Sequence, residues 1–163
     1  MATLSARLRA ARGLVVAQVW LPERVVRALL ARGGPACVVV SVNALPATVP
    51  TNFVYFGGSI VCATDDDRMT RAAADSAVVA LSAQGIGSSG RWQWHVQAVG
   101  RTATIDDADT RAELAMLGLL PPGSQRPVDY VRMMPEVLTG RQFGAVPSPG
   151  AAYELDVEPE AGA

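Results

Sequence analysis

The alternation of apolar and polar positions divides the chain into one early helix and a series of short strands. Residues 22–30 predict a helix, because Pro22 suits a first helical position and the apolar residues after it fall on one stripe. The twenty residues before this helix fit a helix face or a strand equally well. Residues 36–42 are rich in β-branched valine, which is typical of a strand buried on both faces.

Two further strands follow at 47–56 and 59–63, joined by the hairpin signal Gly57-Gly58. Pro50 has no N–H group, so it indicates an edge or a bulge in the first of them. A short alanine-rich helix over 68–74 and a fourth strand over 77–83 complete this half of the chain. The sequence therefore changes from one helix to a largely β pattern.

The second half begins with a Gly- and Ser-rich segment, 84–90, which we expect to be a mobile loop. Residues 91–105 predict the longest strand, with Trp92 and Trp94 on one face. An amphipathic helix over 106–119, capped by Asp106 or Asp107, and a last strand over 128–139 follow.

Six short strands with mostly tight connections and few helices predict a mainly β fold, a small six-stranded antiparallel barrel with peripheral helices. We expect three parts: an N-terminal extension over 1–20, the barrel domain over 21–144, and an acidic, flexible tail over 145–163.

The composition fits one domain, since the chain has 163 residues, of which 50% are hydrophobic and 18% charged. No window holds enough uninterrupted apolar residues for a transmembrane helix, and no signal-peptide pattern opens the chain. A cytoplasmic protein without membrane association is the expectation.

All 14 basic residues are arginine, and the formal net charge is −1. The absence of lysine excludes Schiff-base chemistry and phosphate binding by a P-loop lysine. Because the arginines are spread along the chain and the pI is about 5.8, nucleic acid is not an expected partner.

Few residues suggest catalysis or metal binding by themselves. Cys37 and Cys62 lie in apolar runs, so both are expected to be buried free thiols. With a single histidine, His95, the chain offers neither a zinc spacing nor a Ser-His-Asp order. The aspartates at 65–67 indicate a solvated turn and helix cap rather than a metal site, and we identify no catalytic residue.

Four stretches in order carry a family resemblance: "ALPATVPTNFVYFGGSIVCAT", "DDDRMTRAAADSAVVAL", "WQWHVQAVGRTATIDD" and "VRMMPEVLTGRQFG". Together they resemble the pyridoxamine 5'-phosphate oxidase-like family of FMN-binding split β-barrels. The resemblance covers about two-thirds of the chain, and it implies a homodimer with flavin sites at the subunit interface.

The resemblance also implies positions for the cofactor. The strand around Thr48, Pro50, Thr51 and Asn52 would contact the edge of the isoalloxazine ring, and Trp94 would touch the ring. The turn with Thr64 and Arg68 would hold the phosphate, because a hydroxyl, free helix-start N–H groups and a guanidinium suit that group. Arg71, one turn further, is a candidate second cation.

Each of these residues has an alternative role. Arg68 could pair with Asp65 or Asp67, and three aspartates in a row would repel a phosphate. Trp94 could fill the core. His95 could be a hydrogen-bonded structural residue, a substrate contact or a haem ligand. Arg141 could bind an anionic substrate or pair with the acidic tail.

The resemblance implies an FMN-dependent oxidoreductase acting on a small-molecule substrate that the sequence does not identify. The alternatives are an F420-dependent reductase on the same fold, a barrel without cofactor that binds a small ligand or a partner protein, and a haem-binding barrel. Pyridoxamine phosphate oxidase itself is not expected, because the C-terminal arginine and histidine pattern of that enzyme is missing. No arginine or histidine occurs after Arg141.

Overall fold

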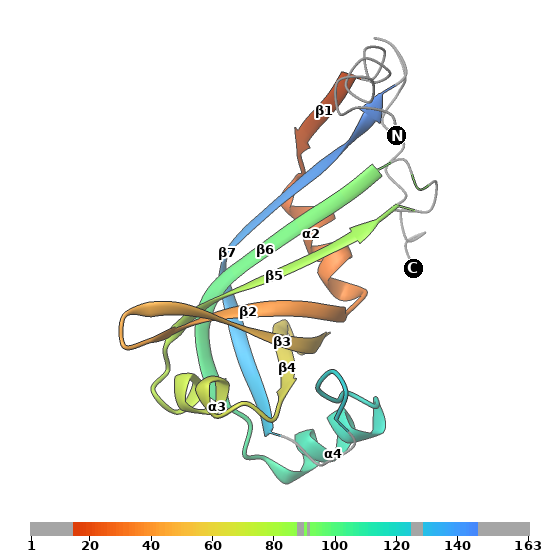
Figure 1. The fold of residues 1–163 in the computed structure, drawn as a ribbon. Helices are drawn as coiled ribbons and strands as arrows, with labels where there is room; N and C mark the ends of the chain where they lie inside the picture. Colours follow the sequence, from red (N-terminus) through yellow and green to blue (C-terminus); the bar gives the residue numbers. More distant parts are fainter. Residues whose placement is uncertain (1–14, 88–89, 91, 125–128, 147–163) are drawn as a thin grey trace, which may run out of the picture.

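The computed structural model describes residues 15–87, 90, 92–124 and 129–146, and Figure 1 shows their arrangement. The elements in chain order are β1 (Val15–Trp20), α2 (Glu23–Ala31), β2 (Gly34–Val42), β3 (Leu45–Phe56), β4 (Ser59–Thr64), α3 (Asp67–Ala74), β5 (Val78–Ile86), β6 (Trp92–Thr104), α4 (Ala108–Met116) and β7 (Asp129–Val146).

Six of the strands close into a ring. The hydrogen-bonded order is β1-β7-β4-β3-β2-β5-β6, and a further pairing of β6 with β7 joins the ends of the ring. Every pairing is antiparallel. The prediction of a mainly β, six-stranded antiparallel split barrel is confirmed, with β1 as a seventh strand outside the ring.

The split in the barrel lies along one side of β7. On that side β7 pairs with β4 through residues 129–133 and with β1 through residues 141–146. Between these pairings the carbonyl of Gly140 accepts a hydrogen bond of 2.9 Å from the N–H of Leu21. A Cβ atom at Gly140 would meet Val26 of α2 at 2.6 Å, so the glycine permits close packing of the helix at the split.

The interior of the barrel is an apolar cluster drawn from every strand of the ring and from α2 and α3. Val38 and Val40 of β2 point into it, whereas Cys37 on the same strand is exposed. The prediction that residues 36–42 are buried on both faces is therefore wrong, and so is the prediction that Cys37 is buried. Strand β2 alternates between the two faces because only one side of it meets the core.

The helices follow the predicted segments with different ends. In α2 the residues Val25, Val26, Leu29 and Leu30 are buried, as their spacing predicts. Helix α4 is shorter than the predicted 106–119, and Asp107 caps it by accepting a hydrogen bond from the N–H of Thr110. Within α4 only Leu114 is buried, so the expected apolar surface is mostly exposed.

Several strand ends also differ from prediction. Strand β5 continues to Ile86, so the predicted loop over 84–90 begins later than expected, because Gln84–Ile86 pair with β6. Strand β7 continues to Val146, beyond the predicted end of the strand and the predicted start of the tail. Pro50 lies beyond the end of the β3–β4 pairing, so β3 has a free edge at this proline. The expected disorder of 147–163 falls outside the described residues.

One irregularity interrupts the longest strand pair. The register between β6 and β7 shifts between Val99 and Gly100. At this bulge a Cβ atom on Gly100 would overlap the carbonyl oxygen of Met134 and lie 2.7 Å from its carbon. In the part of the chain that is described, no helix is long and apolar enough to cross a membrane.

Candidate functional site

Four of the predicted site residues, Thr48, Pro50, His95 and Arg141, lie on the outside of the barrel. Strand register places residues of β3, β2, β5, β6 and β7 side by side on the surface opposite the core, and we call this surface the outer face. Its members are Thr48, Pro50, Cys37, Val39, Ala80, Ser82, Gln84, Ile86, Gln93, His95, Gln97, Val99, Val137, Thr139, Arg141 and Phe143.

The outer face carries little charge. The described strands contain only two acidic residues, Asp129 and Glu136, both in β7. Glu136 pairs with Arg101 at 3.9 Å. The face between β3 and β7 therefore presents small, apolar and neutral polar side chains together with one imidazole, His95, and one guanidinium, Arg141.

The predicted phosphate turn is built around Asp66. Thr64 is buried at the end of β4, and its hydroxyl accepts a hydrogen bond of 3.0 Å from the N–H of Asp66. The Asp66 carboxylate caps α3 by accepting a hydrogen bond of 2.9 Å from the N–H of Arg68. The prediction of a capped, solvated turn at 65–67 is confirmed.

The same carboxylate pairs with Arg68, the residue predicted to bind the phosphate. Nη2 of Arg68 lies 2.6 Å from Oδ2 of Asp66, and Nε donates to Oδ1 at 2.9 Å. The expected alternative partners, Asp65 and Asp67, are not the ones used, because the cap fixes the carboxylate of Asp66 beside the guanidinium. The hydrogen bond from Arg68 lowers the pKa of Asp66. An anion thus already lies where helix-start N–H and guanidinium groups converge.

The predicted contact residues of β3 divide between the inside and the outside of the barrel. Thr51 is fully buried, and its hydroxyl donates to the carbonyl of Ala63 at 2.8 Å. Asn52 donates from Nδ2 to the carbonyl of Leu120 at 2.8 Å and so connects β3 to the segment after α4. Thr48 and Pro50 are exposed on the outer face. Arg71 is exposed, and the described residues hold no ion pair to it.

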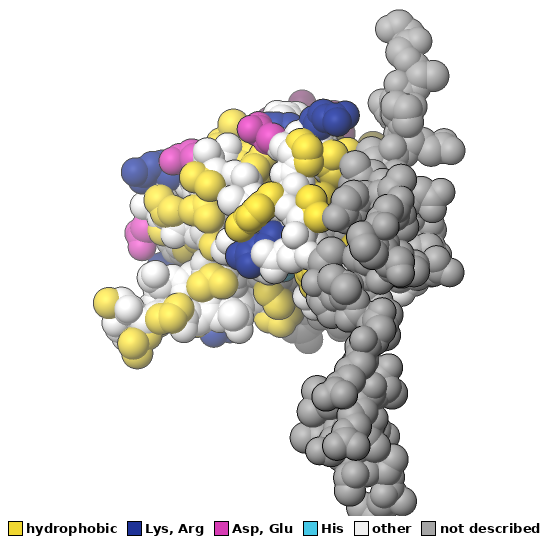
Figure 2. Space-filling view, turned by 90° about the horizontal axis from the view of Figure 1, so that it is seen from above, with side chains coloured by type: hydrophobic (Ala, Val, Ile, Leu, Met, Phe, Trp, Pro, Cys, Tyr) yellow, Lys and Arg dark blue, Asp and Glu magenta, His cyan; other side chains and the backbone are white. Residues whose placement is uncertain are grey.

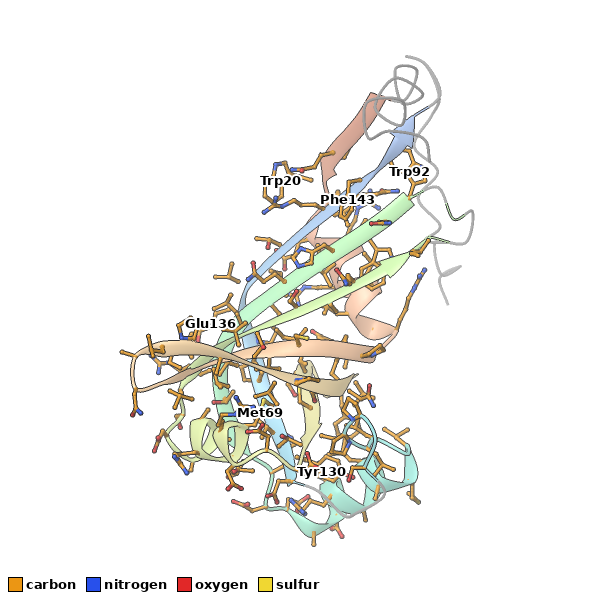
Figure 3. The ribbon with its side chains drawn as sticks, in the orientation of Figure 1. Trp20, Met69, Trp92, Tyr130, Glu136 and Phe143 are labelled. Atoms are coloured by element: carbon orange, nitrogen blue, oxygen red, sulfur yellow. The ribbon has the colours of Figure 1, made fainter. Side chains whose placement is uncertain are left out.

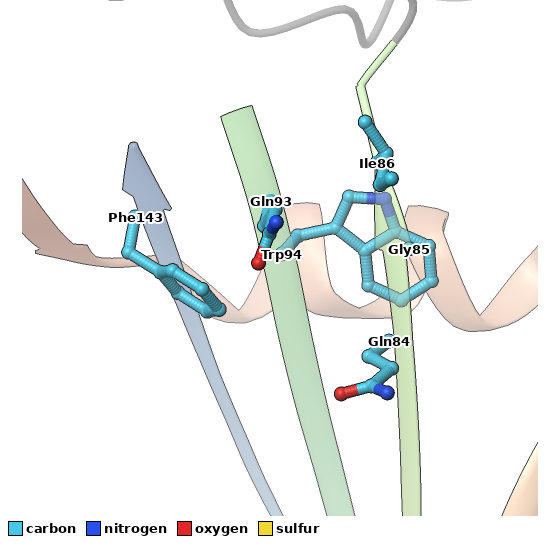
Figure 4. Close-up of a pocket in the computed structure, with 6 residues that line it drawn as sticks. All are labelled: Gln84, Gly85, Ile86, Gln93, Trp94 and Phe143. Carbon is cyan, nitrogen blue, oxygen red and sulfur yellow. The ribbon is translucent and has the colours of Figure 1, made fainter. Parts of the chain in front are cut away.

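Trp94 packs across a glycine at the end of the sheet. It is half-buried against the core cluster, and Gly85 lies opposite it on β5. A Cβ atom at Gly85 would approach Cε2 of the indole to 2.6 Å, so only glycine permits this packing. Figure 4 shows the indole lying over Gly85, with Gln84 and Ile86 on either side. These residues line a pocket of about 310 Å³ together with Gln93 and Phe143.

His95 points to the opposite side of β6 from Trp94, as their spacing predicts. Its Nε2 lies 2.8 Å from the hydroxyl oxygen of Ser82 on β5. Arg141 lies opposite His95 on β7, and its guanidinium carbon sits 4.6 Å from the ring centre of Trp20. Sequence reasoning missed Ser82 and Trp20, because each comes from a neighbouring strand and only the register shows the contact.

The predicted cofactor residues form two groups within one copy of the chain. Helix α3, with Arg68 and Arg71, packs against β6 near Thr102, whose hydroxyl donates to the carbonyl of Ala72 at 3.0 Å. Trp94 lies eight residues earlier on β6, about 26 Å along an extended strand. A single copy of the chain therefore does not bring the phosphate turn and the Trp94–His95 region together.

The two cysteines should differ sharply in reactivity. Burial raises the pKa of the Cys62 thiol to about 12, although a hydrogen bond with Thr51 acts in the opposite direction. Cys37 is exposed on the outer face. Because the thiolate is the reactive form, we expect iodoacetamide at pH 8 to modify Cys37 alone in the folded protein. Mass spectrometry should show a second modification only after unfolding in guanidinium; rapid double labelling of the folded protein would contradict the structure.

A ring of six antiparallel strands, split along β7 and closed by α2, defines the chain as a split β-barrel. The family model described as pyridoxamine 5'-phosphate oxidase matches residues 22–142. The chain therefore belongs to this family, as the sequence motifs predict. The match runs from the start of α2 almost to the end of β7.

Several solved structures have the same fold. The FAD binding protein from Mycobacterium smegmatis is 25% identical, with a TM-score of 0.61 over 77% of this chain and 98% of that one. A FAD-binding protein from Mesorhizobium loti is 16% identical, with a TM-score of 0.64 over 81% and 99%. The FAD and heme binding protein from Mycobacterium smegmatis is 17% identical, with a TM-score of 0.57 over 88% and 91%. No curated protein matches the chain.

Proposed function

We propose that this protein is a flavin-dependent oxidoreductase that binds FMN and acts on a small molecule. The observation that carries the proposal is the family match over residues 22–142. The fold shared with FAD-binding proteins, one of them 25% identical, supports a flavin nucleotide as the cofactor. The flavin, when bound, supplies the redox chemistry, which is consistent with the absence of an acid–base constellation in the sequence.

The residues of the phosphate turn suit a phosphate once Asp66 releases Arg68. The cap and the guanidinium are already arranged around an anion, so a phosphate would replace one anion by another. The Arg68–Asp66 pair is partly solvent-exposed, and such pairs contribute little to stability. Arg71 would add a second cation, while Thr48, Pro50 and Asn52 would border the ring. Thr64 would act indirectly by holding the turn.

The proposed assembly is a homodimer with the flavin between subunits. The separation of the phosphate turn from Trp94 supports it, because a second copy could complete the site. Exposed apolar side chains on or beside the outer face, among them Ile86, Val137 and Met134, also support it. Figure 2 shows hydrophobic side chains spread over one surface of the molecule between charged groups.

We expect light scattering at micromolar concentration to give the mass of a dimer. The interface should bury more than about 2,000 Å² in total, as interfaces of obligate dimers usually do. A mass near the 17.0 kDa of one chain would contradict the assembly. Dilution to nanomolar concentration is the control, because a weak dimer would dissociate there by mass action.

The cofactor is tested by the absorption spectrum of the freshly purified protein. A bound flavin gives absorption bands near those of free FMN, and heat release followed by chromatography distinguishes FMN from FAD. A deazaflavin or haem spectrum would assign another cofactor to the barrel and overturn the FMN proposal. A colourless protein that also fails to quench the fluorescence of added FMN would favour a barrel without cofactor.

A further inference from the structure

The outer face has a second chemical feature that flavin binding does not explain. Strand register aligns Trp20 of β1, Arg141 of β7, His95 of β6 and Gln84 of β5 in one row across the sheet. We call this the cationic row. Residues opposite each other on paired antiparallel strands have Cβ atoms about 5 Å apart, so Arg141 and His95 can address the same ligand group.

Arg141 is held in place but not neutralised. Its guanidinium stacks on the ring of Trp20, which projects from the end of β1 (Figure 3). Such stacking orients the plane of the guanidinium and leaves its N–H edge free. Within the described residues no carboxylate pairs with Arg141. The nearest acid along β7, Glu136, is five residues away, about 16 Å along an extended strand, and pairs with Arg101.

His95 is oriented by Ser82. The contact of 2.8 Å uses Nε2 of the ring, and the described part of the chain shows no hydrogen bond to Nδ1. If the Ser82 hydroxyl donates to Nε2, the neutral ring carries its proton on Nδ1, which is then a donor. In that arrangement Ser82 is a positioning residue, because its hydroxyl sets which ring nitrogen of His95 can donate to a ligand.

An apolar row lies directly beside the cationic row. Ile86, Gln93 and Phe143 stand two residues further along the same three strands, and they line the pocket of about 310 Å³. Two residues along a strand span about 6.6 Å, so one small molecule reaches both rows. The first row offers donors and positive charge, and the second offers an isoleucine and an aromatic ring.

We propose that these two rows form a binding site for an aromatic or apolar carboxylate, with the carboxylate at Arg141 and His95 and the apolar body against Ile86 and Phe143. A planar guanidinium edge fits the two oxygens of a carboxylate. This site deepens the proposed function: the carboxylate would be the substrate of the proposed flavoenzyme, and that role rests on the proposed function. The binding site itself does not require the flavin.

His95 is the only histidine of the chain, so its imidazole gives one set of nitrogen NMR signals. The probe is sodium benzoate, titrated into the full-length protein, with benzamide as its neutral analogue. We expect benzoate to shift the His95 signals saturably and benzamide to leave them unchanged at the same concentrations. Shifts of equal size with both compounds would overturn the proposal, because the carboxylate would not be recognised.

Variants locate the site. Arg141→Gln should weaken benzoate binding about tenfold or more, whereas Arg101→Gln, which removes an arginine of the same sheet already paired with Glu136, should change it less than about twofold. Ser82→Ala should change the tautomer of His95 and weaken benzoate severalfold, and Ser82→Thr should restore both. Circular dichroism checks that the variants fold. Unchanged benzoate affinity in Arg141→Gln would overturn the assignment.

Two further results separate this inference from its alternatives. If the protein binds benzoate but takes up no flavin, the carboxylate site is supported and the proposed flavin-dependent activity is wrong. If benzoate binds only when the tail acids Glu154, Asp156, Glu158 and Glu160 are replaced by their amides, the tail is the occupant of Arg141 and the proposal is wrong.

Discussion

Replacing Gly100 by alanine should destabilise the protein by at least about 3 kcal/mol, because the added methyl group has no space. The Cβ atom would overlap the backbone carbonyl of Met134, and Pro135 lies 3.2 Å away on the same strand. A backbone carbonyl cannot rotate away as a side chain can, so β6 and β7 must separate locally. This pair closes the ring, so the damage affects the whole barrel.

Thermal unfolding followed by circular dichroism measures the effect. For a chain of this size the expected loss lowers the melting temperature by roughly 6–12 °C. Ala103→Gly, at an exposed position of the same strand, is the control and should cost no more than about 1 kcal/mol. A change of 2 °C corresponds to roughly 1 kcal/mol or less for a chain of this size. If Gly100→Ala melts within about 2 °C of the wild type, the strands do not approach as closely as described.

The second large effect concerns the cofactor. Arg68→Ala should weaken FMN binding about ten- to a hundredfold, because it removes a charge-assisted contact to the phosphate. Asp66→Asn should act in the opposite direction: an asparagine still caps α3, but it no longer competes as an anion for Arg68. Arg68→Lys should restore part of the affinity, since it keeps a positive charge without the fork geometry.

Titration of FMN by quenching of flavin fluorescence compares these variants directly. Arg24→Ala, an exposed arginine on α2, is the matched control and should bind as the wild type does. Asp67→Asn should have a smaller effect than Asp66→Asn, because the ion pair of Arg68 is made with Asp66. If Arg68→Ala binds FMN as tightly as the wild type, the phosphate lies elsewhere, although the flavin proposal itself survives.

Local pattern was sufficient for most of the fold. The stripe in α2, the Gly57-Gly58 hairpin and the alternation around Trp94 each reflect interactions within one or two neighbouring segments, and the structure confirms them. The errors arose where a distant segment decides. Cys37 lies among valines, which suggested burial, but the core covers only one face of its strand. Gln84 begins a Gly- and Ser-rich segment that suggested a loop, yet pairing with β6 keeps Gln84 in a strand.

The candidate site was less accessible to sequence reasoning. The motifs around Thr48, Thr64 and Arg68 could be found because they are contiguous in the chain. The contact of His95 with Ser82, and that of Arg141 with Trp20, depend on strand register. A polar Ser82 between two buried apolar neighbours was the available signal, since it indicated an outward-facing position on a strand. The partner of Arg68 was uncertain for another reason, because three adjacent aspartates offer the same chemistry.

The position of β7 has a consequence for biosynthesis. This strand pairs with β4, β6 and β1, so the ring cannot close until residues 129–146 are available. A nascent chain in which these residues are still inside the ribosome has the free edges of β4 and β6 exposed, and such edges can pair with other chains. Contacts between segments far apart in sequence also form slowly. The barrel should therefore be completed only after residues 129–146 have emerged from the ribosome, and its period of greatest risk of aggregation lies between the synthesis of β6 and the docking of β7.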